Sequence, residues 1–264
     1  MKENKISFII CCNNDFYLEE CRLYLNDLIV PDGMEMDIIE VRGASSMTSG
    51  CNTGMKRSNA KYKVYLHQDV FIKNKNFISD ILSVFQDDEK IGMIGMVGTP
   101  YMAKTGTMWE GIRFGAYYKL EEYIERGVIE TFRPLKSGYL EVEAVDGLLI
   151  ATQYDLPWRD DIFQKWDFYD VSQSYEFIKA GYKVVVPGQN PEWYIHDCGI
   201  INLMNYSDER KKFLKYYSEF IKNRQGENWE QYRQKVVEKV NHGYHGTEAE
   251  KEELINIAKN IKDY

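Results

Sequence analysis

Cysteine is scarce in this chain, and the positions of the few that occur exclude two common kinds of stabilisation. The 264 residues include five cysteines, of which Cys11 and Cys12 are adjacent, and none are spaced as C-x-x-C. An odd number without that spacing argues against a disulfide framework and against a structural zinc site. We therefore expect reduced thiols and a cytoplasmic protein.

The sequence also lacks long apolar runs and an excess of positive charge. Its first apolar run, residues 6–12, is too short for a signal peptide and far too short for a membrane span. The formal net charge is −8, whereas nucleic-acid binding normally requires a basic field. We expect no nucleic-acid partner and no membrane span. A small anionic ligand is compatible with this charge if a metal ion or local Lys and Arg residues offset its own charge.

The chain does contain enough apolar sequence for a large core, in the pattern of an α/β fold. Hydrophobic residues make up 44% of it. Up to about residue 200, short apolar runs alternate with amphipathic stretches, as in strands interleaved with helices. We expect strands at 6–12, 38–41, 64–68, 91–97 and 182–186, helices at 15–28, 49–59, 77–85 and 171–180, a loop-rich middle at 98–138, and a further strand in 140–152.

The end of the chain has the composition of charged helices. From about residue 207, apolar residues recur at helical spacing, and Thr247 with Glu250 predicts a capping box before the last helix. We predict a catalytic domain over 1–206 and a helical extension over 207–264. The aromatic and Lys-rich first helix of this extension either packs on the sheet domain or touches a membrane surface, and packing is the commoner use of such a helix.

Three polar residues stand out because each lies at the boundary of an apolar run. Asp69 follows the expected strand 64–68, Asp170 precedes a helix, and His196 follows an aromatic segment. A carboxylate at the carboxyl end of a buried strand lies where open α/β sheets bind ligands. Each residue also has a local explanation: a turn or helix cap for the aspartates, and a hydrogen bond at a sheet edge for the histidine.

Six short segments follow one another in an order that points to one family. They are Ile6–Asn14, Cys51–Met55, Leu66–Val70, Val145–Gly147, Phe168–Asp170 with Ala180–Val184, and Ile195–His196. Together they resemble the GT-A glycosyltransferases of the family 2 kind, and more narrowly a bacterial group in which a strand ends in His-Gln-Asp-Val in place of the usual Asp-x-Asp. The resemblance covers roughly residues 5–200. It implies a mixed, Rossmann-like α/β sheet flanked by helices.

The resemblance also implies a nucleotide-sugar site at the carboxyl ends of the first strands. Asp69 would bind a divalent cation that bridges the donor diphosphate, and His196 would be a second protein ligand. One carboxylate, one imidazole, phosphate oxygens and water suit Mn²⁺ better than Ca²⁺, with Mg²⁺ as the alternative. Asp170 matches the aspartate that acts as general base on the acceptor hydroxyl in inverting members.

Further residues are expected near the donor because they match positions close to it in the family. They are Cys11, Asn13, Asn14, Arg42, Asn52, His67, Gln68 and Asp146. Arg42 contacts base or phosphate, or else lies at the surface, and Asp146 orients sugar hydroxyls or else forms an Asp-Gly turn. Three tryptophans either stack on sugar rings or pack in the protein, namely Trp109, Trp158 and Trp166.

Three positions depart from the family pattern. His67 replaces the first aspartate of Asp-x-Asp, Arg42 stands where many members have an acidic pair, and Tyr169 precedes Asp170 where a glutamate is usual. The first two departures, at His67 and Arg42, motivate an alternative, a sugar-nucleotide-binding module without activity. A metal-dependent nucleotidyltransferase is a third reading, although no evident Gly-rich phosphate loop lies near the start of the chain.

These observations and the resemblance predict a cytoplasmic, metal-dependent glycosyltransferase. It would move a sugar from a nucleotide-diphosphate sugar, such as a UDP-sugar, to a hydroxyl of a carbohydrate or glycoconjugate acceptor. The resemblance implies inversion at the anomeric carbon and a role in polysaccharide or glycoconjugate synthesis. The base, the sugar, the acceptor and the oligomeric state are left open by the sequence.

Overall fold

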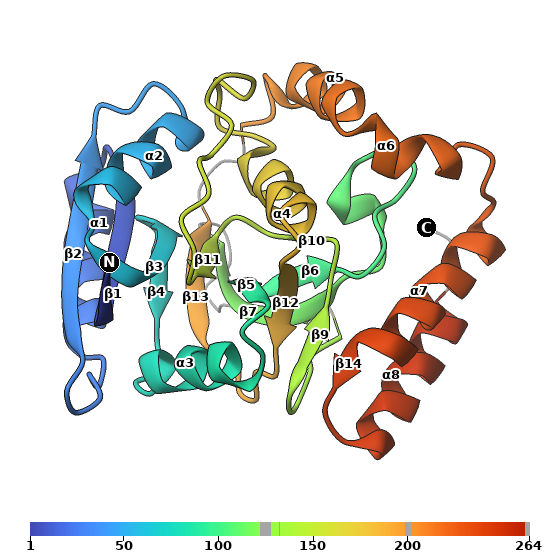
Figure 1. Cartoon of the computed structure of the whole chain (residues 1–264), viewed down its shortest axis with the longest axis horizontal. Helices are drawn as coiled ribbons and strands as arrows, with labels where there is room; N and C mark the ends of the chain where they lie inside the picture. Colours follow the sequence, from blue (N-terminus) through green and yellow to red (C-terminus); the bar gives the residue numbers. More distant parts are fainter. Residues whose placement is uncertain (122–127, 132, 199–201, 262–264) are drawn as a thin grey trace.

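The protein is built around a mixed eight-stranded sheet, as described by a computed structural model for residues 1–121, 128–131, 133–198 and 202–261 (Figure 1). The strand order is β14-β9-β12-β5-β11-β3-β1-β2. The strands are β1 (Lys2–Cys12), β2 (Glu35–Arg42), β3 (Ala60–His67), β5 (Ile91–Gly95), β9 (Tyr139–Glu141), β11 (Leu149–Thr152), β12 (Lys183–Pro187) and β14 (Tyr244–His245). Strand β1 pairs in parallel with both β2 and β3, whereas β11 runs antiparallel to β3. The predicted α/β class is confirmed.

A smaller second sheet lies at the carboxyl end of β3. Its strand order is β10-β6-β7-β13-β4, with β8 paired to β7. The strands are β4 (Val70–Ile72), β6 (Val97–Thr99), β7 (Phe114–Glu121), β8 (Val128–Thr131), β10 (Ala144–Val145) and β13 (Tyr194–Cys198). Because β4 follows β3 almost directly, the short connection between them holds Gln68 and Asp69 at the junction of the two sheets.

The helices are arranged around these sheets (Figure 1). They are α1 (Asp15–Asn26), α2 (Met47–Arg57), α3 (Phe77–Asp87), α4 (Tyr169–Lys179), α5 (Tyr206–Tyr216), α6 (Ser218–Ile221), α7 (Trp229–Gly243) and α8 (Glu248–Asn260). The Asn14 side chain caps α1 by accepting a hydrogen bond from the Phe16 amide, and Ser46 with Ser49 forms a capping box at α2. Gly181, with φ of +86°, lies just past the end of α4, where a left-handed residue commonly ends a helix.

Strand β1 packs on both faces, because it lies inside a sheet that helices cover from two sides. Phe8 and Ile10 contact the cluster that contains residues of α1 and α3. Ile9 points the other way, into a cluster with residues of α2. The approach of α2 is close, since a Cβ at Gly54 would lie 2.2 Å from the Ile9 side chain. Burying each such side chain contributes about 1.5–3 kcal/mol, so this strand anchors the edge where the first polar residues emerge.

The middle of the chain differs from the expectation in two regions. The region 98–138, expected to be loop-rich, contains β7 and β8. In the region 140–152 the expected strand pattern is present, but it is divided among β9, β10 and β11, and β10 belongs to the second sheet. The change of sheet occurs at Asp146 and Gly147, where the Asp146 carboxylate accepts a hydrogen bond from the Leu148 amide at 3.0 Å and so forms a turn.

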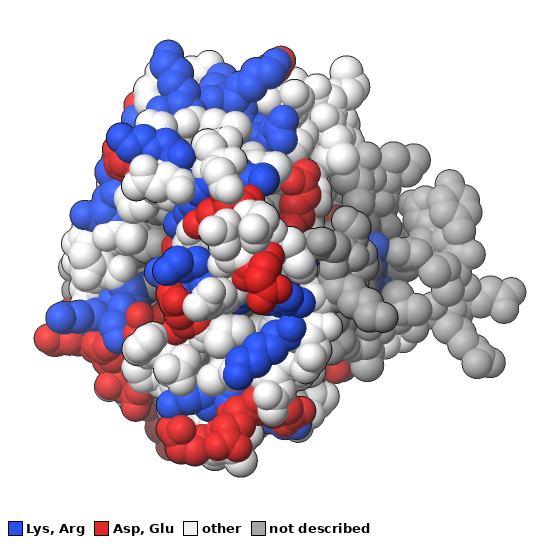
Figure 2. All heavy atoms as spheres, turned by 90° about the vertical axis from the view of Figure 1, so that its right-hand side faces the viewer, with Lys and Arg blue, Asp and Glu red and all other residues white. Residues whose placement is uncertain are grey.

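The C-terminal helices α7 and α8 lie side by side at the end of the molecule opposite β2 (Figure 1). On this side of the molecule, Lys and Arg are interspersed with Asp and Glu (Figure 2). Thr247 caps α8, but the Glu250 side chain does not complete the predicted capping box; it bonds instead to the Lys136 amide and the Ser137 hydroxyl. In the part of the chain that the structure describes, no helix is both long enough and apolar enough to span a bilayer.

Residues after 206 are tightly joined to the sheet region. Strand β14 pairs with β9 and forms one edge of the main sheet. The buried Arg224 side chain bonds both carboxylate oxygens of Glu143, at 2.8 and 3.0 Å, and stacks on Tyr101 at 3.8 Å. The division at residues 206 and 207 stays a prediction.

Candidate active site

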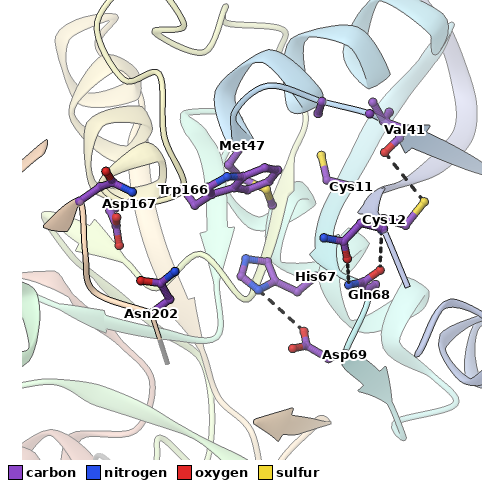
Figure 3. Close-up of a pocket in the computed structure, with 14 residues that line it drawn as sticks. Cys11, Cys12, Val41, Met47, His67, Gln68, Asp69, Trp166, Asp167 and Asn202 are labelled. Carbon is purple, nitrogen blue, oxygen red and sulfur yellow. Dashed lines mark hydrogen bonds and ion pairs between the residues drawn. The ribbon is translucent and has the colours of Figure 1, made fainter. Parts of the chain in front are cut away.

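The cavity that is lined by several of the expected site residues, called the main cavity below, lies where β1, β2 and β3 end, as expected for a ligand site in an open α/β sheet. Its volume is about 380 Å³. Figure 3 shows it with the side chains that line it, which are Cys11, Cys12, Asn13, Val41, Gly43, Ala44, Met47, His67, Gln68, Asp69, Trp166, Asp167, Asn202 and Asn205. Polar groups thus come from the ends of two neighbouring strands and from two later segments of the chain.

Gln68 connects the segments that follow β1 and β3 by hydrogen bonds, and so holds the two strand ends together beside this cavity. Its Oε1 accepts hydrogen bonds from the amides of Asn13 and Asn14, at 2.9 and 3.0 Å, and its Nε2 donates to Asn13 Oδ1 at 2.7 Å. Both ends of the Gln68 amide are therefore occupied. Of the expected donor residues here, Asn13 lines the cavity, while the Asn14 side chain serves as the cap of α1.

Asp69, His67 and His196 converge beside the cavity. Asp69 Oδ2 lies 3.7 Å from His196 Nε2, and Asp69 Oδ1 lies 3.8 Å from His67 Nδ1. These distances exceed a hydrogen bond. The structure brings Asp69 and His196 together from β13 and from the connection after β3, although 127 residues separate them along the chain (196 minus 69). Burial tends to raise the pKa of Asp69, but the two histidines outweigh this effect and lower it below its usual range.

Two polar atoms of this group have no hydrogen-bond partner among the described residues. They are Asp69 Oδ1 and His196 Nδ1, and both are buried. Buried polar atoms without a partner are rare and call for an explanation such as an ion. An ion at the Asp69 carboxylate would give Oδ1 a partner. Two bonds of about 2.0–2.2 Å to one ion span up to about 4 Å, so Asp69 Oδ2 and His196 Nε2, which are 3.7 Å apart, can both reach the same metal, although binding through Nε2 does not give His196 Nδ1 a partner. The residues present therefore fit a divalent cation.

The protein supplies only part of a coordination shell. No group of three or more His, Cys, Asp or Glu side chains in residues 1–121, 128–131, 133–198 and 202–261 is arranged to hold a metal. A cation held by Asp69 and His196 would need ligands from water or from a bound anion. Such an open site suits a metal that acts on a bound phosphate, since Mg²⁺ and similar ions are often held by one or two protein groups plus substrate oxygens.

A second, smaller cavity of about 120 Å³ adjoins the first, and Trp166 and Asp167 line both. Asp146 and Asp170 line the second cavity with Trp109 and Tyr206. Burial, with a smaller contribution from the nearby Asp146 carboxylate, raises the pKa of Asp170 to about 7. The amide of Val171 donates a hydrogen bond to the Asp170 carboxylate at 2.8 Å and opposes this rise.

The segment that carries Asp170 is held in an uncommon backbone conformation. Phe168, directly before α4, has φ of 60° and ψ of 6°, in the left-handed region that residues other than glycine seldom adopt. Strain of this kind costs about 1–3 kcal/mol and concentrates at functional sites. It turns the chain so that Asp167 faces the main cavity and Asp170 lies in the first turn of α4.

His67 connects the two cavities. Its Nε2 lies 2.6 Å from the hydroxyl of Tyr169, the first residue of α4. His67 lines the larger cavity and Tyr169 the smaller one. Burial lowers the pKa of His67, which favours a neutral imidazole at this junction.

Two expected donor residues lie away from both cavities. Arg42 is exposed and pairs with Asp15 at 2.6 Å. The buried Asn52 donates a hydrogen bond to the Trp158 carbonyl at 2.8 Å and accepts one from the Trp158 amide at 2.9 Å, so it holds a core loop. Trp158 itself is 2% exposed and packs in the core.

Several residues that line the main cavity were not predicted from the sequence. They are Gly43, Ala44, Met47, Asp167, Asn202 and Asn205. Asp167 directly precedes the segment Phe168–Asp170, which resembles the family. Its position next to that segment could have identified it as a site residue. The two asparagines lie in an irregular segment before α5 that carries no motif. Of the tryptophans considered for stacking, Trp109 and Trp166 are exposed by 45% and 49%.

Comparisons with known proteins agree with this fold. The mannosyltransferase PcManGT from Pyrobaculum calidifontis, solved with GDP-Man and Mn²⁺, has a TM-score of 0.51 at 11% identity, over 89% of this chain and 68% of that one. Staphylococcus aureus TarS with UDP gives 0.46 at 11% identity, over 97% and 71% of the two chains. A mutant of Drosophila β1,4-galactosyltransferase 7 with manganese, UDP-Gal and xylobiose gives 0.46 at 13%, over 78% and 73%.

At such low identity, a structural likeness speaks for the fold alone. No curated protein matches the sequence significantly. The model of a family described as glycosyltransferase-like matches residues 7–217, most of the chain and both cavities with it. The protein has the GT-A fold of nucleotide-sugar transferases and belongs to this glycosyltransferase-like family.

Proposed function

We propose that this glycosyltransferase uses a divalent metal, preferably Mn²⁺, and transfers a sugar from a nucleotide-diphosphate sugar to a hydroxyl acceptor. The observation that carries the proposal is the pair of adjoining cavities. One is lined by Asp69, which has a buried oxygen without a described partner and lies 3.7 Å from His196, and the other is lined by Asp170 with a raised pKa. Donor and acceptor would meet where the cavities share Trp166 and Asp167.

Asp69 and His196 would hold the metal beside the donor diphosphate. A metal bound there supplies Lewis-acid stabilisation of the charge that develops on the diphosphate as the glycosidic bond breaks. Residues at the end of β1 would bind the nucleotide. Cys11 and Asn13 line the cavity there, and Gln68 holds the Asn13 side chain by a hydrogen bond. Arg42 and Asn52 are left out of this binding set because their side chains are engaged elsewhere.

Asp170 would act as the general base. Its carboxylate would take the proton of the acceptor hydroxyl as that oxygen bonds to the anomeric carbon and the bond to the diphosphate breaks. A base works best when its pKa lies near the working pH, which fits a carboxyl group with a pKa of about 7. A single displacement of this kind inverts the anomeric configuration.

The donor class, the location and the pathway have separate support. PcManGT is described in complex with GDP-Man and Mn²⁺, which supports a nucleotide-sugar donor and a metal for a chain of the same fold. We infer a cytoplasmic location and a role in polysaccharide or glycoconjugate synthesis from the family resemblance. The free thiols of Cys11, Cys12, Cys21 and Cys51 agree with a reducing compartment.

The first test is calorimetry with a panel of nucleoside diphosphates and their sugars, with and without Mn²⁺. We expect one nucleotide to bind, and Mn²⁺ to strengthen its binding in the native protein but not in Asp69→Asn. Asp32→Asn is the control, because Asp32 is exposed in the turn before β2. Failure of every nucleotide to bind would refute the proposed function.

Binding without turnover would favour the sugar-nucleotide-binding module over an enzyme. Hydrolysis of the bound nucleotide sugar by water needs no acceptor and can be followed by release of the nucleoside diphosphate. We expect slow, Mn²⁺-dependent release from the native protein. Release of pyrophosphate from a nucleoside triphosphate and a sugar phosphate would point instead to a nucleotidyltransferase.

A further inference from the structure

One hydrogen bond joins the two halves of the candidate site. His67 lies at the end of β3 and Tyr169 at the start of α4, 102 residues apart in the sequence, yet the imidazole Nε2 and the phenol oxygen are 2.6 Å apart. Both residues depart from the pattern of the family that the sequence resembles. The structure places these two departures in direct contact.

The position of the Tyr169 hydroxyl is fixed by its surroundings. Tyr169 is only 6% exposed. A Cβ at Gly147 would lie 2.1 Å from the Tyr169 hydroxyl oxygen, so only glycine leaves room for that oxygen. The turn after β10 therefore packs directly against the Tyr169 hydroxyl at the start of α4.

The contact links the position of the proton on His67 to the Tyr169 hydroxyl, because either group can be the donor in it. In a neutral imidazole one ring nitrogen donates and the other accepts, and the hydrogen bond at one nitrogen sets the state of the other. When the Tyr169 hydroxyl donates to Nε2, the proton of His67 resides on Nδ1. Nδ1 faces Asp69 Oδ1 at 3.8 Å, and Figure 3 shows His67 directed at Asp69 from within the cavity. An N–H directed at a carboxylate is favourable, whereas a lone pair there is not.

We propose that Tyr169 is a positioning residue: through His67 it orients the surroundings of Asp69, and it ties the donor-binding end of β3 to the helix that carries Asp170. This inference rests on the proposed function only for its consequence, which is tighter binding of the metal and the nucleotide. Its structural part, the proton on Nδ1 of His67, is independent of any ligand.

The structural part is tested by nitrogen-15 NMR of the histidine side chains. The chain has four histidines, so their ring signals can be assigned by single substitution. We expect His67 of the native protein to carry its proton on Nδ1, and the Tyr169→Phe variant to lose this preference. Tyr175→Phe is the matched control, since Tyr175 is on the same helix but its hydroxyl bonds Glu143 at 3.3 Å. An unchanged His67 spectrum in Tyr169→Phe would overturn the inference.

The functional part is tested by calorimetry with Mn²⁺ and the nucleotide that the native protein binds. Removing a group that orients a metal ligand typically weakens metal binding by about 10–100-fold; we expect about tenfold for Tyr169→Phe and no change for Tyr175→Phe. Adding Tyr169→Phe to Asp69→Asn should cause no further loss of metal or nucleotide affinity, because both substitutions act through the carboxylate of Asp69. Gly147→Ala should weaken binding similarly, by displacing the hydroxyl.

The outcomes separate the two claims. A native protein that binds no nucleotide refutes the proposed function and removes the consequence for donor binding, while the NMR result still decides the proton position. A nucleotide that binds Tyr169→Phe as tightly as the native protein overturns the positioning role. Full additivity of Tyr169→Phe and Asp69→Asn would overturn it as well, because independent effects would mean that Tyr169 does not act through Asp69.

Discussion

Replacing Asp170 by asparagine should abolish most turnover and at the same time stabilise the fold at neutral and alkaline pH. Burial raises the pKa of this carboxyl from 3.8 to about 7, so the folded protein holds a proton there that the unfolded chain has already lost. The native protein therefore loses stability as the pH rises from about 4 to about 7, by about 1.36 kcal/mol per pH unit. Asparagine does not titrate, so the variant lacks this loss.

The size of the expected change in the free energy of unfolding follows from the pH range between the two pKa values of Asp170. Between about pH 5 and about pH 8, the native protein should lose up to about 2.5 kcal/mol relative to Asp170→Asn. This is an upper figure, because Asp170 is only partly buried and solvent reduces the effect. Urea unfolding of both proteins at the two pH values measures it directly. Asp160→Asn is the control, since Asp160 is exposed on the loop before α4 and should leave the pH dependence unchanged.

The same variant tests catalysis. Removing a general base typically lowers the rate by about 10²–10⁴-fold, so release of the nucleoside diphosphate should fall by that factor while nucleotide affinity is retained. In the native protein, kcat/KM should rise about tenfold per pH unit and level off above about pH 7. Two results would refute the reasoning: equal pH dependence of stability in the native protein and the variant, or undiminished turnover by Asp170→Asn.

Three further variants test separate parts of the structure. Arg224→Ala removes the bidentate partner of the partly buried Glu143 carboxylate, which keeps the Met102 amide, Tyr175 and Lys239, and should lower the free energy of unfolding by about 1.5–3 kcal/mol in urea titrations. Asn52→Ala should cost about 2 kcal/mol through two lost backbone hydrogen bonds but leave nucleotide affinity unchanged in calorimetry, which would contradict a donor role. Gly50→Ala places a Cβ 2.3 Å from Cys11 Sγ, so it should push that thiol into the main cavity and weaken nucleotide binding by about tenfold, or about 1.4 kcal/mol.

The parts of the fold that the sequence predicted are those with a strong local pattern. Strands β1 and β3 lie inside the main sheet and are buried on both faces, so they read as continuous apolar runs. Helix α1, expected at residues 15–28, begins at Asp15, and α4 was found within two residues of its start. In each case, residues that are neighbours in the chain determine the element.

The missed parts depend on partners far away in the chain. Strand β7 contains Gly115, whose φ of 116° disfavours a strand, yet it is held between β6, β13 and β8. Strand β10 has only two residues, and it is a strand only because β6 pairs with it. Tertiary pairing of this kind overrides local propensity and leaves no mark in a single sequence.

The candidate site likewise contains residues that could be predicted from the sequence and residues that could not. Asp69 and Asp170 could be singled out because each ends or begins an element, and the structure places each beside a cavity. The contact of His67 with Tyr169 could not be predicted, because only the folded topology brings the start of α4 to the end of β3. Arg42 could not be placed either, since its partner Asp15 becomes a neighbour only when β2 pairs with β1.

The edge strand β14 makes completion of the main sheet depend on a segment that lies far along the chain from its neighbour β9. The opposite edge is β2, at residues 35–42, whereas β14 is formed by Tyr244 and His245. During translation, β9 would stay open on one side until β14 has left the ribosome, and an open strand edge invites pairing with other chains. A protein shortened after residue 206 would keep that edge permanently, so aggregation is its expected fate.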